Sequence, residues 1–341
     1  MMRRWSGLGM MLVALGAGIG PAVADEDRPI ERTPKPLAAQ ATQGDSAFAI
    51  RLTSNNLIEM TLTNYGFMGN NFVSRASSMV YPKGATDLNG NPVAYEHMVR
   101  GGVWFGANAR DQNGLFTGVV TASTDGNQGT SSNAATEWTP IGKSVESRSI
   151  LLTSPTFSNE AVSEEDLIAN YDDRVVRRAA QNAETHRPMG IKVSQTSYSW
   201  AFSDYQNIIF FHYEFTNTGP VMTDAWVGLY TELACGNKSV YTTRNIWPPS
   251  STGSIVGGWF SKKWLGYDDS LSLYREHYCM SQPIPDGCNL TLAPYWIGLR
   301  VLGAKGLAED TTKRKITFQT WNWDPNSAAR DQDVERYQVL G

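Results

Sequence analysis

The chain is poor in charge. Only 18% of its 341 residues are Asp, Glu, Lys or Arg, against roughly 25% in an ordinary soluble domain. The formal net charge is −4 and no run of Lys or Arg stands out, so the electrostatic footprint of a nucleic-acid-binding protein is missing. No apolar run reaches about 18 residues, the length that a membrane-spanning helix needs. We therefore expect neither a nucleic-acid partner nor a membrane span.

Recognisable catalytic and cofactor signatures are also missing. The chain has no glycine-rich phosphate loop, no HExxH metal motif and no GxSxG nucleophile motif. Its four histidines are scattered, and its three cysteines lack the CxxC or Cys/His spacing that is typical of zinc sites. These absences predict no cofactor and favour a protein that is not an enzyme. A hydrophobic content of 41% nevertheless excludes a disordered chain.

The N-terminus carries an export signal. Two arginines precede a charge-free apolar run from Gly7 to Gly20, which ends in the small-residue sequence Ala22-Val23-Ala24. This order is typical of a secretory signal peptide, and the run is too short to span a bilayer. We predict that residues 1–24 are a signal peptide cleaved before Asp25. The protein is then expected in the periplasm, on the cell surface or outside the cell.

An oxidising compartment allows a disulfide bond. Cys279 and Cys288 bracket a stretch containing Pro and Gly that can turn back on itself, so we predict that they pair. Two reduced thiols remain the alternative, because spacing alone does not determine connectivity. Cys235 is expected to be a buried small side chain.

The remaining chain is expected to divide into a polar leader and a β-rich region. Residues 25–46 are polar and carry three prolines, which predicts a flexible leader. Residues 47–341 are predicted to be mainly β, forming an antiparallel β-sandwich with one or two short inserted helices. The sandwich is either one large unit or two fused units with a boundary near residues 155–185.

Period-two alternation and turn signals locate the elements. Strands are predicted at residues 57–64, 101–107, 115–122, 191–202, 208–217, 225–235, 271–279, 295–302 and 315–323. A helix is predicted from Ser163 to Ala179, because a capping-box-like start precedes apolar residues that recur every four positions. A short terminal helix is predicted at residues 328–340.

Residues 190–235 are the most informative stretch. Three strands with short connections predict an antiparallel meander, in which Phe211, Phe215 and Leu229 face the core. The opposite face then carries polar and amphipathic side chains on neighbouring strands. These are His212, Glu214, Trp226, Tyr230 and Glu232.

This second face suggests a ligand site. Trp226 and Tyr230 offer flat apolar surfaces with polar tips, which suit stacking on a sugar ring. Glu214 and Glu232 are candidate catalytic carboxylates if they lie about 5–10 Å apart, and His212 is a candidate proton carrier. The simpler alternative is a half-exposed sheet face that a loop or second layer covers.

A weaker candidate site lies earlier in the chain. Asp87, Asn89 and Asn91 place oxygen donors at alternate positions, as calcium loops do. However, the glycine comes too early and no Glu follows at the twelfth position, so an Asx-type turn is favoured over Ca²⁺ binding.

One long segment resembles a known class of proteins. The sequences HRPMGIKVSQTSYSW (186–200), NIIFFHYEFTNTG and DAWVGLYTEL are similar to a recurrent part of large secreted bacterial proteins of unknown function. Many of those proteins resemble cargo of type IX secretion. The resemblance covers about residues 55–337, and it implies structural motifs but no catalytic residue. Relatives continue with further β structure and often a sorting domain, so a truncated or shorter form is expected.

These observations favour an exported cell-envelope or extracellular protein that binds a ligand or has a structural role. The expected partner is a polysaccharide, bound through the aromatic and carboxylate face, or another envelope protein. One alternative is a polysaccharide-acting hydrolase or lyase that uses Glu214 and Glu232. A second alternative is a surface subunit that assembles with copies of itself.

Overall fold

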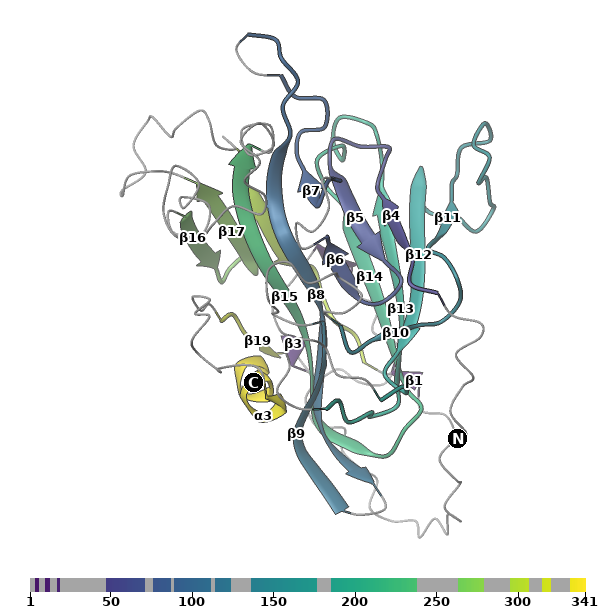
Figure 1. The fold of residues 1–341 in the computed structure, drawn as a ribbon, viewed down its shortest axis with the longest axis vertical. Coiled ribbons are helices and arrows are strands. Elements are labelled where there is room, and N and C mark those ends of the chain that lie inside the picture. Colours follow the sequence, from purple (N-terminus) through teal and green to yellow (C-terminus); the bar gives the residue numbers. More distant parts are fainter. Residues whose placement is uncertain are drawn as a thin grey trace.

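The computed structural model describes residues 4–5, 10–12, 17–18, 47–70, 76–86, 89–111, 114–123, 136–176, 185–237, 263–278, 295–306, 315–319 and 332–341. Within these residues, two antiparallel β-sheets share one hydrophobic core, and a single short helix, α3 (Asp333–Leu340), packs outside them (Figure 1). The predicted mainly β, antiparallel sandwich is therefore confirmed. No helix of the described residues has the length and apolarity needed to cross a bilayer.

Sheet A holds the strands that carry the candidate site. Its order is β10 (Thr139–Pro140), β12 (Glu165–Asp172), β13 (Ile191–Ser199), β14 (Phe210–Asn217), β2 (Met10–Leu12), β18 (Ile297–Val301), β17 (Leu273–Tyr278) and β16 (Lys263–Asp268). Two further strands pair at its side, β11 (Glu146–Arg148) with β12 and β1 (Arg4–Trp5) with β14.

Sheet B faces sheet A across the core. Its order is β19 (Lys315–Ile316), β3 (Ala17–Gly18), β15 (Met222–Asn237), β8 (Tyr95–Asp111), β6 (Phe67–Gly69), β5 (Glu59–Thr63) and β4 (Ile50–Leu52). β7 (Met79–Val80) pairs with β5 and β8, and β9 (Gly114–Ala122) pairs with β8. The long strands β8 and β15 run together along the molecule in Figure 1.

Alternating side chains build the core. Along β13 the odd-numbered residues are buried and the even-numbered residues are half-buried. Phe211, Phe215 and Leu229 all lie in the core, as predicted. The rings of Phe105 in sheet B and Phe215 in sheet A are 5.7 Å apart, so the core is continuous between the sheets. Burying one such side chain contributes roughly 1.5–3 kcal/mol.

The predicted three-stranded meander is wrong in its third strand. β13 and β14 form the expected hairpin, but β15 pairs with β8 in sheet B. The chain leaves sheet A at Gly219, where a Cβ atom would lie 1.9 Å from the carbonyl oxygen of Met189. The adjacent Thr218 N–H donates to Gly190 at 2.8 Å and holds this crossing in place. Both sheets border the same core. The same alternate residues of β15 would therefore be buried in either sheet, and the sequence pattern does not show which sheet the strand joins.

The predicted helix that begins at Ser163 is also wrong, because β12 occupies this position. The carboxylate of Asp166 accepts the N–H of Ser163 at 2.8 Å and its hydroxyl at 2.5 Å. The motif that resembles a helix cap therefore closes a turn before a strand. Leu167 and Tyr171, four residues apart, lie on one face of a strand as well as of a helix, so their spacing does not distinguish the two. The predicted terminal helix is confirmed at α3, within 328–340.

Three short strands come from the predicted signal peptide. β1 pairs with β14, β2 lies between β14 and β18, and β3 lies between β15 and β19. A chain processed before Asp25 lacks all three strands. Their removal would leave backbone edges in both sheets that other strands can pair with.

Candidate functional site

The outer face of sheet A carries the candidate site. Residue pairing sets the outward-pointing positions of β12, β13 and β14 side by side, and side chains directly opposite one another have Cβ atoms about 4.5–5.5 Å apart. The rows are Asp166, Tyr198 and Phe210; Ile168, Thr196 and His212; Asn170, Ser194 and Glu214; and Asp172, Lys192 and Thr216. The face is therefore aromatic at one end and polar at the other.

Four aromatic rings gather at the aromatic end. We call Trp200, Phe202, Tyr205 and Phe210 the aromatic cluster. Their ring centroids lie 5.2–6.4 Å apart, and every member contacts at least two others. Phe202 is 48% exposed and Tyr205 is 40% exposed, so the cluster is open to solvent rather than part of the core. Exposed rings in mutual contact are an unusual use of apolar surface, so the aromatic cluster is the candidate site on this face.

The turn between β13 and β14 positions this cluster. Tyr205 and Gln206 both donate backbone N–H groups to the carbonyl of Phe202, at 3.0 and 2.9 Å. The carbonyl of Gln206 in turn accepts the N–H of Leu57 at 2.7 Å, which ties the turn to the segment before β5. The rings therefore stand on a hydrogen-bonded support.

Tyr198 and Asp166 connect the cluster to the polar rows. Burial, followed by the negative charge of Asp166, raises the pKa of Tyr198 above its usual value. The hydroxyl of Tyr198 stays protonated at neutral pH, and it forms a side-chain hydrogen bond with Thr196 in the neighbouring row. His212 and Glu214 follow in the next two rows, both half-buried.

The other predicted site residues lie on the opposite side of the sandwich. Trp226, Tyr230 and Glu232 belong to β15 in sheet B, so the five residues do not form one cleft. Tyr230 stacks on Trp104 with centroids 5.6 Å apart and planes 7° apart. Glu232 forms an ion pair at 2.5 Å with Arg100, whose side chain is buried.

Helix α3 covers the part of this second face that holds Trp226 and Tyr230. Leu340 packs with Trp104, Trp226 and Tyr230 in a small apolar cluster outside the main core, and Gly341 lies against the indole of Trp226. Packing therefore accounts for Trp226 and Tyr230, as the simpler alternative expected. Packed sheets are about 10 Å apart, and Glu214 and Glu232 point away from the core on opposite sides. They do not share an acid–base site.

The predicted calcium loop and the predicted disulfide bond both stay predictions. Asp87 and the pair Cys279 and Cys288 lie outside the described residues. Asn89 and Asn91 are exposed in a loop closed by the isolated bridge between Thr86 and Pro92. Among the described residues, no group of three His, Cys, Asp or Glu side chains could hold a metal ion.

A buried charged network was not anticipated from the sequence. Asp173 accepts the N–H groups of Met189 and Ile191 at 2.8 and 2.7 Å, and burial raises its pKa. His186 contacts the Asp173 carbonyl oxygen at 3.0 Å and lies 3.9 Å from Glu137. These side chains are sealed from solvent, so the network supports the fold and offers no access to a substrate.

The aromatic cluster was also missed, although a signal was present. The predicted strands and turn at 191–217 already imply a hairpin, and a hairpin brings Trp200 and Phe210 together. Comparison with protein-family models, with curated proteins and with solved structures gives no match for this chain.

Proposed function

We propose that this protein is an exported envelope or extracellular binding protein whose outer face of sheet A recognises a carbohydrate chain. The observation that supports this proposal is the exposed aromatic cluster, which continues directly into rows of hydroxyl, imidazole and carboxylate groups. Sugar rings present an apolar C–H face and a rim of hydroxyls. Aromatic rings suit the first, and hydrogen-bonding side chains suit the second.

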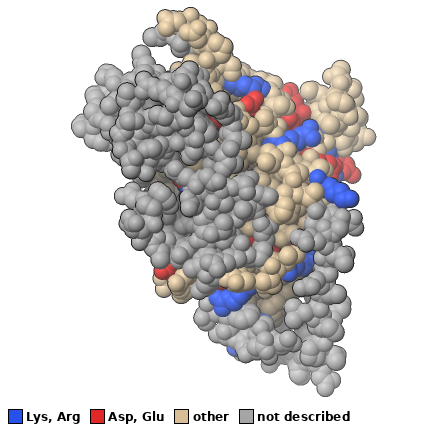
Figure 2. Space-filling view, viewed as in Figure 1, with Lys and Arg blue, Asp and Glu red and all other residues tan. Residues whose placement is uncertain are grey.

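The charge of the face favours a neutral or weakly charged ligand over a strongly anionic one. The rows carry three carboxylates, Asp166, Asp172 and Glu214, and one lysine, Lys192, so the face is mildly acidic. On the side of the molecule that Figure 2 shows, basic and acidic side chains are interspersed among uncharged ones. A strongly anionic polymer would instead need a concentration of Lys and Arg. Export, as predicted from the N-terminal sequence, would bring the protein to a compartment where polysaccharides are found.

Affinity electrophoresis through gels containing soluble polysaccharides tests this proposal. The wild-type chain should be retarded by at least one polysaccharide, and calorimetric titration should then give its affinity. The double variant Trp200→Ala/Phe202→Ala should bind at least tenfold more weakly, because it removes two rings that would bury apolar surface against the sugar at roughly 25 cal/mol per Å².

The matched control is Trp296→Ala. Trp296 is a half-exposed indole outside the aromatic cluster, so its loss should leave the affinity unchanged. Equal retardation of the wild type and the double variant would contradict the proposal, as would the absence of retardation across neutral and acidic polysaccharides.

A further inference from the structure

β14 and β18 are joined through only three residues. Met11 of β2 is the register partner of Phe211 in β14 and of Val301 in β18, while Met10 pairs with His212 and Leu12 with Arg300. β2 is antiparallel to both strands, so β14 and β18 run parallel to each other. The space between them has room for one strand, which β2 occupies in part. We call this space the β14–β18 groove.

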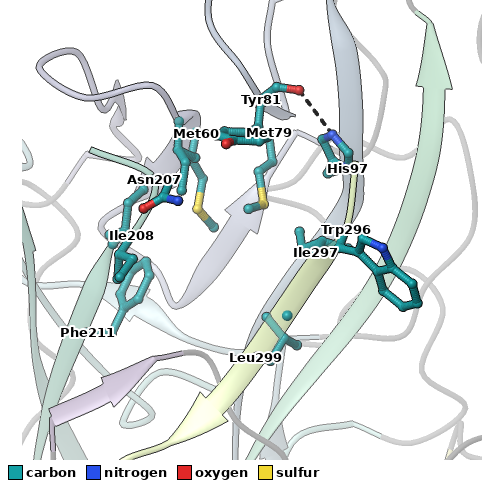
Figure 3. Close-up of a pocket in the computed structure, with 13 residues that line it drawn as sticks. Met60, Met79, Tyr81, His97, Asn207, Ile208, Phe211, Trp296, Ile297 and Leu299 are labelled. Carbon is teal, nitrogen blue, oxygen red and sulfur yellow. Dashed lines mark hydrogen bonds between the residues drawn. The ribbon is translucent and has the colours of Figure 1, made fainter. Parts of the chain in front are cut away.

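A cavity of about 140 Å³ continues the groove beyond β2. Ile208, Ile209 and Phe211 line one side, and Ile297, Gly298 and Leu299 line the other. Met60 and Met79 of sheet B also line it, together with the polar side chains of Tyr81, His97 and Asn207. Figure 3 shows Ile208 and Phe211 facing Ile297 and Leu299 across the space, with the two methionines above. The cavity is about the size of one benzene ring, and its lining is both polar and apolar.

The register shows how a longer strand would meet this cavity. Phe211 of β14 and Val301 of β18, which share a partner residue in β2, are both buried. Two residues further along, Ile209 and Leu299 are also buried, and they line the cavity. A strand that pairs with both edges at this level would place one side chain between Ile209 and Leu299, and its sequence neighbours would face outward.

We propose that, in the processed protein, the β14–β18 groove accepts an extended strand from another polypeptide, with apolar residues at alternate positions and one of them filling the cavity. The proposal rests on the export part of the proposed function, because cleavage before Asp25 removes β2. A polypeptide fits this groove better than a small molecule does. Only a strand pairs with the backbone edges of β14 and β18 while burying side chains between the sheets.

The test uses the chain recovered after export and a labelled synthetic peptide of residues 8–16, LGMMLVALG, as the probe. Mass spectrometry first establishes whether the chain starts at Asp25. Fluorescence anisotropy should then show saturable peptide binding. Val13→Asp in the peptide should weaken binding at least tenfold, because it places a charge between the buried side chains of Ile209 and Leu299. Leu12→Lys, the matched control on the outward position, should bind within about threefold of the parent peptide.

The outcomes separate the two proposals. Equal binding of the Val13→Asp and Leu12→Lys peptides, or no binding of the parent peptide, overturns the groove proposal and leaves polysaccharide binding unaffected. A chain that keeps residues 1–24 overturns both the groove proposal and the export part of the proposed function.

Discussion

Asp333, the first residue of α3, is held as a buried carboxyl group among several charges. Arg187 donates to it at 3.2 Å and Arg336 lies 3.6 Å away. Glu137 faces the same space, 4.0 Å from Arg336, and His186 lies beyond it. Burial, followed by the charge of Glu137, raises the pKa of Asp333 to about 6, although both arginines lower it.

This pKa predicts a pH-dependent stability. The folded state binds the proton of Asp333 more tightly than the unfolded state, so the stabilisation is present at low pH and lost as pH rises through about 6. Between pH 4.5 and 7.5 the loss should be on the order of 2 kcal/mol. Urea unfolding of wild type and Asp333→Asn at both pH values measures it. Between the two pH values, the free energy of unfolding of the variant should fall by about 2 kcal/mol less than that of the wild type. Equal losses in the two proteins would show that Asp333 does not titrate as described.

At the scale of elements, α3 depends on glycines in the strands beneath it. A Cβ at Gly228 of β15 would lie 2.3 Å from Leu340, and one at Gly106 of β8 would lie 2.7 Å from the same side chain. Tyr337 adds a hydrogen bond from its hydroxyl to the carbonyl of Asp224 at 2.8 Å. Because these glycines have no side chains, Leu340 can lie directly against the backbone of sheet B. The glycines therefore determine where the helix packs.

Gly228→Val should displace α3. The added side chain overlaps Leu340, so the free energy of unfolding should fall by about 1–3 kcal/mol, and the C-terminus should become more sensitive to protease. Gly303→Val is the matched control, because a Cβ there meets no atom within 4 Å and the change should cost less than about 0.5 kcal/mol. Similar losses in both variants would argue against the packing described for α3.

β12 shows why an element can be assigned wrongly from its pattern. Ser163 and Asp166 have the residue types of a capping box, and Leu167 and Tyr171 have helical spacing. The same side chains satisfy a turn and a strand once β13 lies beside them with eight residue pairs. Propensity and spacing are local, whereas the cross-strand partner comes from elsewhere in the chain.

At the scale of the whole molecule, the two sheets are expected to unfold together. Phe211 of sheet A and Leu229 of sheet B belong to the same hydrophobic core. Phe211→Ala should cost about 3–5 kcal/mol and Leu229→Ala about 2–5 kcal/mol. For each variant, the urea transition followed by circular dichroism and the one followed by tryptophan fluorescence should move to lower urea and still share one midpoint. Two separated transitions would instead indicate that the sheets are independent units.

The amino-acid sequence by itself determined the β class, most strand positions and the inward faces of β14 and β15, because burial in these two strands alternates with a period of two whichever strand lies alongside. It also determined that His212 and Glu214 face outward from β14. Only the tertiary structure decided that β15 joins sheet B. As a result, Trp226 and Tyr230 pack under α3, and the aromatic cluster remains as the open face. Alternation reports which side of a strand is buried, but it carries no information about which sheet, or which covering element, provides the burial.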